Sequence, residues 1–427
     1  MNEPTPTPGP APVTEVAAAR SSRARSLPTP GAKRATVIGA GSFGTALAVL
    51  LARGGLRTTL QTRTAEQART LEEQRENRVY LPGVELPAQL RIEPSAAGLA
   101  RADYVFLAVP SQALGPVVAG LREAGLGRRT AVVSVAKGLV PPDGAPPTTV
   151  LEAAFGAERV ACLGGPAHAQ EMVHAGAGLV AAAHDEDLAR QLAQVFTRAG
   201  VVCERSDDPL GVELAGAAKN AAALAAGATE AQGLNAAGAA AGHIFAEVWR
   251  YAETLGARPE SMIGLAGTGD LVATALAPES RNRRAGELLA AGVPAAEIPA
   301  RIGQAVEALE SVPLLARALE RAGGQGSGER GERAERARGE QARDGRGERA
   351  RREQAPDERA WGGRALGGRA LGGRAPITSA LGRLIAGELP LHEWVALVRA
   401  TVPPPALWRR RPQPGFWRRL WERLARA

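Results

Sequence analysis

The sequence contains few aromatic residues and very few cysteines. Phe, Trp and Tyr make up 4% of its 427 residues, so any hydrophobic core must be built mainly from Ala, Leu and Val. Its only cysteines, Cys162 and Cys203, have neither a second Cys nor a His at the spacing of metal ligands. We therefore expect no disulfide framework and no metal site, and cysteine usage favours a reducing, cytoplasmic environment.

The sequence also lacks a long apolar segment. No run of about 18 apolar residues is free of charge, Gly and Pro, so we expect neither a membrane span nor a secretory signal. A hydrophobic content of 45% is enough for two domains with cores. The formal net charge of +8 arises from three low-complexity segments, and the remainder is mildly acidic. The positive charge therefore does not indicate that the core binds nucleic acid.

These three segments are the N-terminal extension, an insertion and the tail. Residues 1–34 are rich in Pro, Thr, Ser, Ala and Arg, and residues 323–375 repeat Gly, Glu, Arg and Ala. Neither can bury enough apolar surface to fold, so we expect both to be disordered. Residues 402–427 interleave Trp and Phe with Arg. This tail could be solvated, could associate weakly with an anionic membrane, or could bind RNA, although we expect no nucleic acid partner.

Order is predicted to begin with a short strand at residues 35–38. A Gly-x-Gly-x-x-Gly motif follows at Gly39, Gly41 and Gly44, and an apolar helix comes next. In this context Gly39 permits a tight turn, Gly41 lets the backbone approach a pyrophosphate, and Gly44 lets the helix pack on the strand. The helix N-terminus would face the negative charge of a dinucleotide. The alternative is an incidental glycine-rich turn.

Further strands alternate with helical segments along the first half of the chain. We predict them at residues 58–62, 104–109, 131–136, 160–165, 179–183 and 201–204. This alternation predicts a Rossmann-type α/β domain with a parallel sheet and a ligand at the carboxyl ends of the strands. Residues 77–87 contain two prolines and are predicted to be a loop. Arg63 follows the second strand with no acidic residue before Glu66, which favours NADP, or tolerance of both cofactors, over strict use of NAD.

Residues 212–284 are rich in Ala, Gly, Leu and Val and are predicted to form closely packed helices. Lys219 and Asn220 interrupt this apolar background, and so does Asp270 after Gly-Thr-Gly. A lysine in an apolar helix is costly to bury unless it has a partner or a task. The alternatives are that Lys219 reaches the surface and that Asp270 caps a helix.

Other polar residues lie where a ligand is expected. Ser280, Arg281 and Asn282 have the pattern of a helix start whose side chains and backbone N–H groups are directed at an anion. A solvated charged turn is the alternative. Lys137 follows a predicted strand, and a surface loop is the other interpretation of it. His168 is predicted to be structural, because no visible motif pairs it with an acid.

These motifs resemble those of the bacterial-type NAD(P)-dependent glycerol-3-phosphate dehydrogenases. The matching segments follow the family's order: GAGSFGTALA (39–48), YLPG (80–83), AVPSQ (108–112), AKGL (136–139), GGPAHAQE (164–171), VELAGAAKN (212–220), GLAGTGDL (264–271), SRNRR (280–284), AVE (305–307) and APIT (375–378). They span residues 35–322 and 375–400. A series of ordered motifs is far more specific than any one of them.

The resemblance implies a Rossmann domain at residues 35–210, followed by an all-α helical domain at residues 211–401 that residues 323–375 interrupt. It implies a cytoplasmic enzyme, often a homodimer, that uses NADP or NAD. The reaction would be reversible hydride transfer between sn-glycerol 3-phosphate and dihydroxyacetone phosphate, which supplies glycerol 3-phosphate for phospholipid synthesis.

The resemblance also implies roles for individual positions. The catalytic residues would be Lys219, as the acid–base, and Asp270. The cofactor contacts would be Gly39, Gly41, Ser42, Phe43, Gly44, Arg63, Lys137, Ala169, Arg281, Ala305 and Glu307. The substrate contacts would be Lys137, Gly165, Ala167, Lys219, Asp270, Ser280, Arg281 and Asn282.

The sequence departs from the family pattern at several positions. Gly164 and Ala167 replace residues that usually carry hydroxyls, and His243 replaces an Arg. These changes bear on substrate affinity more than on reaction type. Two other functions stay open: a related two-domain dehydrogenase acting on another small hydroxy compound, and a non-catalytic membrane- or RNA-binding protein that acts through its basic tail.

Overall fold

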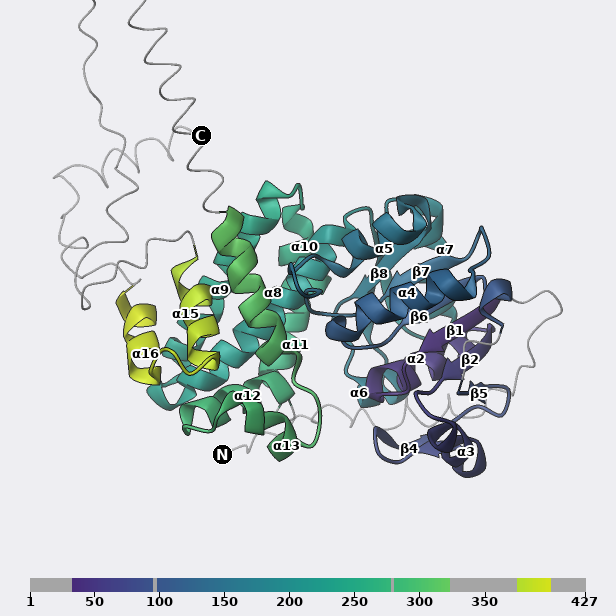
Figure 1. The fold of residues 1–427 in the computed structure, drawn as a ribbon, viewed down its shortest axis with the longest axis horizontal. Helices are drawn as coiled ribbons and strands as arrows, with labels where there is room; N and C mark the ends of the chain where they lie inside the picture. The colour runs from purple at the N-terminus through teal and green to yellow at the C-terminus, as the bar shows by residue number, and fades with distance from the viewer. Residues whose placement is uncertain (1–32, 95–97, 278–279, 323–374, 401–427) are drawn as a thin grey trace, which may run out of the picture.

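The computed structural model describes residues 33–94, 98–277, 280–322 and 375–400. The expectations for residues 1–32, for the insertion at 323–374 and for the tail at 402–427 lie outside these ranges. The described chain forms an N-terminal α/β part and a C-terminal helical part that lie side by side (Figure 1). Within it, no helix is long and apolar enough to cross a membrane.

An eight-stranded sheet forms the centre of the α/β part. Its strands lie in the order β10-β9-β8-β7-β6-β1-β2-β5. Their bounds are β1 Arg34–Ile38, β2 Arg57–Gln61, β5 Arg91–Glu93, β6 Tyr104–Leu107, β7 Ala131–Ser134, β8 Val160–Gly164, β9 Gly178–Ala182 and β10 Val202–Ser206. All neighbouring strands except β8 and β9 are parallel. The predicted Rossmann-type α/β fold is confirmed, with one antiparallel pair.

Two details differ from the sequence prediction. Strand β9 runs antiparallel to β8 because the connection between them holds only the six-residue helix α6 (Ala169–His174), which does not carry the chain back along the sheet. Residues 77–87 are not simply a loop, since β4 (Leu81–Glu85) pairs with β3 (Glu76–Asn77). A proline is tolerated in β4 because a two-stranded ribbon leaves an unpaired edge on each strand.

Helices cover both faces of the sheet. On one face α2 (Ser42–Arg53) and α7 (Glu186–Arg198) pack their apolar side chains against the strands in a single core. On the other face α4 (Leu114–Ala124) and α5 (Pro147–Phe155) form a second core. Helix α3 (Ala65–Gln74) lies against β5. The carboxyl ends of β1, β2, β5, β6, β7 and β8 lie at one edge of the sheet, and those of β9 and β10 lie at the other.

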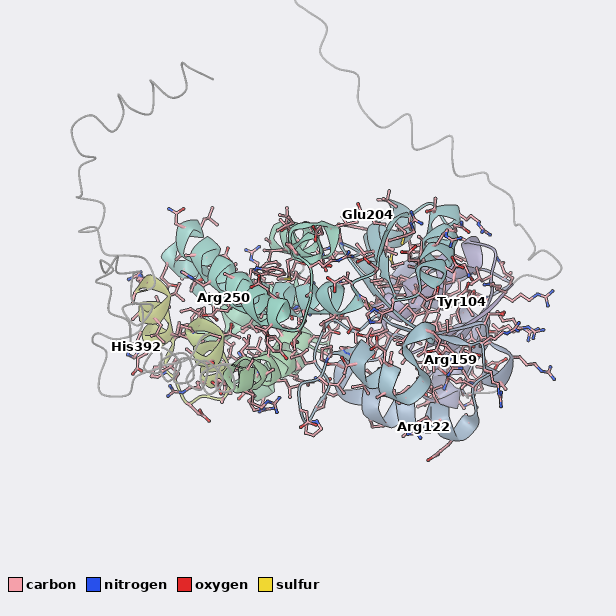
Figure 2. The ribbon with its side chains drawn as sticks, turned by 90° about the horizontal axis from the view of Figure 1, so that it is seen from above. Tyr104, Arg122, Arg159, Glu204, Arg250 and His392 are labelled. Atoms are coloured by element: carbon pink, nitrogen blue, oxygen red, sulfur yellow. The ribbon has the colours of Figure 1, made fainter. Side chains whose placement is uncertain are left out.

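Helix α8 (Pro209–Thr229) is the centre of the helical part, and nearly all of its residues are buried. Around it lie α9 (Leu234–Thr254), α10 (Pro259–Ile263), α11 (Asp270–Leu276), α12 (Arg281–Ala290), α13 (Ile298–Ile302), a helix at residues 307–322, α15 (Pro376–Ile385) and α16 (Leu391–Ala400). The prediction of closely packed helices is confirmed. In Figure 2, Arg250 on α9 and His392 on α16 mark one end of the molecule, and Tyr104 on β6 marks the other.

Candidate functional site

The glycine-rich turn joins β1 to α2 at the carboxyl edge of the sheet. Gly39 has φ +111°, and a Cβ on it would lie 2.5 Å from the carbonyl oxygen of Ala108. A Cβ on Gly44 would lie 1.9 Å from the carbonyl oxygen of Gly39, whereas one on Gly41 would meet nothing within 4 Å. The N-terminus of α2 has neither a side-chain cap nor an acidic residue in its first turn. The turn therefore has open backbone and free N–H groups for a pyrophosphate.

A side chain that the motif did not indicate holds this turn in place. Asn77 is buried on β3, and its Nδ2 donates to the carbonyl oxygen of Ala40 at 3.0 Å and to Thr45 Oγ1 at 2.8 Å. The sequence pattern assigned Asn77 to a loop and predicted no role for it. Pairing of β3 with β4 is what brings it to the turn.

The end of β2 offers two further groups to a dinucleotide. Gln61 accepts a hydrogen bond from the backbone N–H of Gly39 at 3.1 Å, so it lies beside the turn. Its side-chain Oε1 is buried and, in the described part of the chain, has no hydrogen-bond partner. A ribose hydroxyl could donate to it. Arg63 is exposed, and its guanidinium forms no ion pair with any described residue. The residues present thus fit a nicotinamide dinucleotide.

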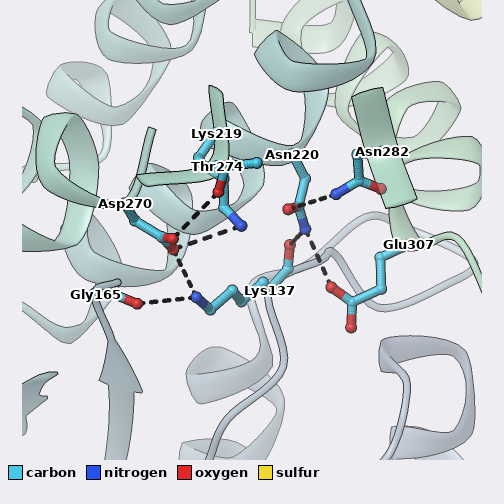
Figure 3. A network of polar contacts seen from close by, with 8 residues as sticks. All are labelled: Lys137, Gly165, Lys219, Asn220, Asp270, Thr274, Asn282 and Glu307. Atoms are coloured by element: carbon cyan, nitrogen blue, oxygen red, sulfur yellow. Dashed lines mark hydrogen bonds and ion pairs between the residues drawn. The ribbon is translucent and has the colours of Figure 1, made fainter. Parts of the chain in front are cut away.

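Lys137, Lys219 and Asp270 meet where the two parts of the molecule join (Figure 3). Lys137 Nζ donates to Asp270 Oδ2 at 2.6 Å and to the carbonyl oxygen of Gly165 at 3.1 Å. Lys219 Nζ lies 3.6 Å from the same Oδ2, and Lys219 is only 7% exposed. Asp270 begins α11 but does not cap it, since Gly269 holds the cap position. The surface alternative for Lys219 and the capping alternative for Asp270 are therefore wrong.

Burial controls the ionisation of this cluster. Burial, followed by the charge of Lys137, lowers the pKa of Lys219 to about 8, although Asp270 and Glu307 oppose the decrease. Burial alone would raise the pKa of Asp270, but the positive charges of Lys137 and Lys219 outweigh it, and the pKa of Asp270 is lowered. The cluster therefore combines a permanent carboxylate with an amine that exchanges its proton near neutral pH.

Asn220, the neighbour of Lys219 on α8, extends this polar network. Its Nδ2 donates to the backbone oxygen of Lys137 and to Glu307 Oε2, both at 3.1 Å. Its Oδ1 accepts from Asn282 Nδ2 at 2.8 Å. Figure 3 shows these contacts continuing from the lysine pair toward Glu307. No role was predicted for Asn220, although its place beside Lys219 in an apolar helix was a usable signal.

Close packing of α8 on α12 brings residues 280–284 to this network. A Cβ on Gly227 would lie 2.0 Å from the carbonyl oxygen of Arg283, and one on Gly286 would lie 2.1 Å from a backbone oxygen of α8. Ser280 caps α12 by accepting a hydrogen bond from the backbone N–H of Arg283 at 3.4 Å. The predicted helix start at Ser280, Arg281 and Asn282 is confirmed.

The two central arginines of the 280–284 cluster point in different directions. Arg281 is exposed, and its Nη1 donates to the carbonyl oxygen of Ala305 at 3.1 Å. Arg283 instead forms a two-point ion pair with Glu230, at 3.0 and 2.7 Å. Arg281 is thus available to an anion, whereas Arg283 holds α12 against the end of α8.

The other predicted positions follow strands β1 and β8. Ser42 and Phe43 are partly exposed in the first turn of α2. Gly165 and Ala167 are buried just after β8, and Ala169 begins α6. Of these residues, Gly165 is linked to Asp270 through Lys137, whose Nζ donates to both.

Among the positions at which the sequence departs from the expected pattern, Gly164 has a structural explanation. A Cβ on Gly164 would lie 2.5 Å from Cγ1 of Val212, so a serine would not fit here without movement of the Val212 side chain. His168 is half-buried, and burial lowers its pKa. His243 lies on α9, where burial also lowers its pKa, followed by the charge of Arg250.

The rarity of lysine in the sequence is a further signal of the site, separate from the motifs. The sequence contains only Lys33, Lys137 and Lys219, and two of these three meet at one carboxylate. By contrast, no group of three or more His, Cys, Asp or Glu residues in the described ranges is placed to hold a metal.

Comparison with known proteins gives a consistent result. Residues 34–189 match the family model described as NAD-dependent glycerol-3-phosphate dehydrogenase N-terminus, and residues 208–325 match the corresponding C-terminus model. The chain is 40% identical over 286 residues to glycerol-3-phosphate dehydrogenase [NAD(P)+] of Deinococcus radiodurans, covering 65% of this chain and 83% of that protein. The corresponding protein of Thermus thermophilus is 43% identical over 288 residues, covering 66% and 87%.

Solved structures agree with the sequence comparison. The crystal structure of glycerol-3-phosphate dehydrogenase from Coxiella burnetii superposes with a TM-score of 0.67 at 25% identity, over 86% of this chain and 99% of that one. The shared region includes both the α/β part and the helical part.

Proposed function

The chain belongs to the NAD-dependent glycerol-3-phosphate dehydrogenase family, and on that premise we propose how its residues carry out the reaction. It is an NAD(P)-dependent oxidoreductase whose substrate pair is glycerol 3-phosphate and dihydroxyacetone phosphate. The observation that carries the residue-level proposal is the pair of lysines, one buried and one partly buried, on the buried carboxylate of Asp270. Removing amines and a carboxylate from water is costly, whereas an ion pair at the surface avoids that cost. The arrangement therefore indicates a functional role.

Lys219 is the proton donor and acceptor. The nicotinamide, when bound, supplies or accepts the hydride. In the reducing direction Lys219 Nζ donates a proton to the substrate carbonyl oxygen as negative charge develops on it, and in the oxidising direction the neutral amine removes the hydroxyl proton. The pKa of about 8 suits both directions near neutral pH. Asp270 orients the amine and balances the charge of the lysine pair.

Lys137 and the start of α12 hold the substrate phosphate. Ser280, Arg281 and Asn282 present a hydroxyl, a guanidinium and an amide at a helix N-terminus, which favours an anion. The backbone oxygen of Lys137 is linked to this helix start through Asn220, which donates to it and accepts a hydrogen bond from Asn282. We propose that Lys137 contacts both the substrate and the cofactor. Gly165 and Ala167 contact the substrate.

The glycine-rich turn and its surroundings hold the cofactor. Gly39, Gly41 and Gly44 would cradle the pyrophosphate, and the N–H groups of Ser42 and Phe43 at the uncapped start of α2 would hold it. Arg63 is the group that would pair with a 2′-phosphate, so we propose that NADP is preferred. The remaining cofactor contacts are Lys137, Ala169, Arg281, Ala305 and Glu307.

A direct assay tests the proposal. Purified protein is mixed with NADPH and dihydroxyacetone phosphate, and the loss of absorbance is followed with NADH in parallel. We expect turnover with both cofactors and a higher kcat/KM with NADPH. Asp270→Asn is expected to lower kcat strongly while cofactor affinity changes little. Tight NADPH binding without turnover on dihydroxyacetone phosphate would refute the proposed substrate roles and direct the search to other small hydroxy compounds.

We also propose that the protein works as a cytoplasmic homodimer that associates through its helical part. Leu234 is 83% exposed at the start of α9, and Ile263 is 73% exposed at the end of α10, which supports an apolar contact. Cys162 and Cys203 are free thiols, which suits a reducing compartment. Size-exclusion chromatography with light scattering tests the mass, and Leu234→Glu should yield monomer. A monomeric wild-type protein would contradict this assembly.

A further inference from the structure

Three arginines share one face of the sheet at the end opposite the candidate site. Strands β1, β2 and β5 are mutually parallel, so their amino-terminal ends lie at one edge and the glycine-rich turn lies at the other. Arg34 is in register with Arg57, and Thr59 is in register with Arg91. Residues in register on neighbouring strands lie about 4.8 Å apart, and alternate residues of a strand share a face. Arg34, Arg57 and Arg91 therefore project on the same side.

These arginines line a hollow of about 440 Å³. Arg101, from the short helix η1 (Leu99–Arg101), adds a fourth guanidinium, and Glu93 is the acidic residue of the lining. The uncharged polar lining residues include Thr36, Thr58, Thr59 and Gln89. A volume of several hundred Å³ is the usual size of a small-molecule site. The hollow thus combines the size of a ligand site with a large excess of positive charge.

The four guanidinium groups have no partner in the part of the chain that the structure describes. None of Arg34, Arg57, Arg91 and Arg101 forms an ion pair or donates a side-chain hydrogen bond there. Acidic groups are nearby, but Asp103 accepts from the backbone N–H of Arg34 at 2.7 Å rather than from its side chain. Unpaired like charges that share a hollow repel one another, and a bound polyanion would remove that repulsion.

We propose that this arginine hollow binds a small polyanion with two linked phosphate groups, at a site separate from the reaction centre. The planar guanidinium donates two parallel hydrogen bonds to a phosphate, which lysine cannot do. The spacing of Arg34 and Arg57 on adjacent strands suits two neighbouring phosphates. The diphosphate can belong to free pyrophosphate or to a nucleotide, since the hollow has room for either.

Calorimetric titration of the full chain with pyrophosphate tests the inference, with NADP present at saturation to fill the glycine-rich turn. We expect the double variant Arg57→Gln/Arg91→Gln to weaken binding by about tenfold or more, because a hydrogen bond to a charged group is worth roughly an order of magnitude in affinity. The matched control is Arg122→Gln, which removes an exposed charge on α4 that is not among the residues lining the hollow. Figure 2 labels Arg122. This control should leave binding unchanged.

Further arms distinguish the reaction centre and the source of the diphosphate. Arg281→Gln should leave pyrophosphate binding intact, since Arg281 belongs to the candidate site and not to the hollow. Tighter binding of ADP than of pyrophosphate would identify a nucleotide site, and equal binding would identify a diphosphate site. Three results overturn the proposal: no binding to wild type, equal weakening by Arg122→Gln, or binding unchanged in both Arg57→Gln/Arg91→Gln and the single variant Arg34→Gln.

Discussion

Replacement of Lys219 by Met separates the catalytic role of this residue from its structural cost. The side chain keeps a similar length and apolar volume but loses the amine. Burial lowers the pKa of Lys219 from 10.5 to about 8, a change of about 3 kcal/mol at about 1.4 kcal/mol per pKa unit. The folded state binds fewer protons here than the unfolded state between pH 8 and 10.5. Below pH 8 the folded protein therefore carries the full cost of the buried charge.

Lys219→Met should therefore lose activity without losing stability. A positioned general acid contributes roughly 10²- to 10⁴-fold, so kcat should fall by about that range with little change in NADPH affinity. In the wild type, reduction of dihydroxyacetone phosphate should decline as pH rises through about 8, because the ammonium form is lost. Oxidation of glycerol 3-phosphate should decline as pH falls through the same value. Both pH dependences should disappear in the variant.

The assay is steady-state kinetics in both directions across this pH range, combined with thermal unfolding at pH 7. Lys33→Met is the matched control, because Lys33 is exposed and contacts Tyr104 far from Asp270. The melting temperature of Lys219→Met should equal or exceed that of the wild type. Unchanged kcat, or a pH dependence near 8 that persists in the variant, would refute the role of Lys219 as the acid–base.

Three further changes test other parts of the structure. Gly44→Ala places a Cβ 1.9 Å from the carbonyl oxygen of Gly39, so the glycine-rich turn must shift. The affinity for NADPH, measured by fluorescence titration, should fall by about tenfold or more. Gly115→Ala is the control, because a Cβ there meets nothing within 4 Å, and it should not alter this affinity. Arg63→Ser should raise KM for NADPH and leave KM for NADH unchanged, and equal effects on both would contradict the 2′-phosphate contact. Burial raises the pKa of Glu213 to about 8, so the folded state retains a proton that the unfolded state loses. Wild-type stability should consequently decline from about pH 4.5 to 8 more steeply than that of Glu213→Gln, as denaturant melts would reveal; parallel declines would contradict this.

Local signals in the sequence were sufficient for much of the fold. Strand β1, the turn at Gly39 and the apolar helix α2 after it are indicated by neighbouring residues alone. Helix α8 follows from its run of Ala, Gly and Leu, and the start of α12 follows from Ser280. The helices satisfy most of their backbone hydrogen bonds internally, so no distant partner is needed to predict them. Strand β1 is indicated by its own residues and by the turn after it, although its backbone hydrogen bonds come from β2 and β6.

Features that depend on a distant partner were predicted poorly or not at all. Strand β4 was assigned to a loop because its proline suggested a break, and its pairing with β3 was not visible. The direction of β9 depends on the path of a short connection and not on its own residues. Asn77 and Asn220 act on groups elsewhere in the chain, so their own sequence neighbourhoods do not reveal those contacts.

The sequence by itself determined which residues are chemically unusual, namely an ammonium in an apolar helix, a carboxylate after Gly-Thr-Gly and a glycine turn after a strand. Only the tertiary structure decided that Lys137 and Asp270, 133 residues apart, meet at 2.6 Å with Lys219 beside them. The physical reason is that such contacts depend on strand order and on how closely helices approach. Here glycines such as Gly227 let α8 and α12 pack backbone to backbone, and that packing brings the substrate-binding and proton-transfer groups together.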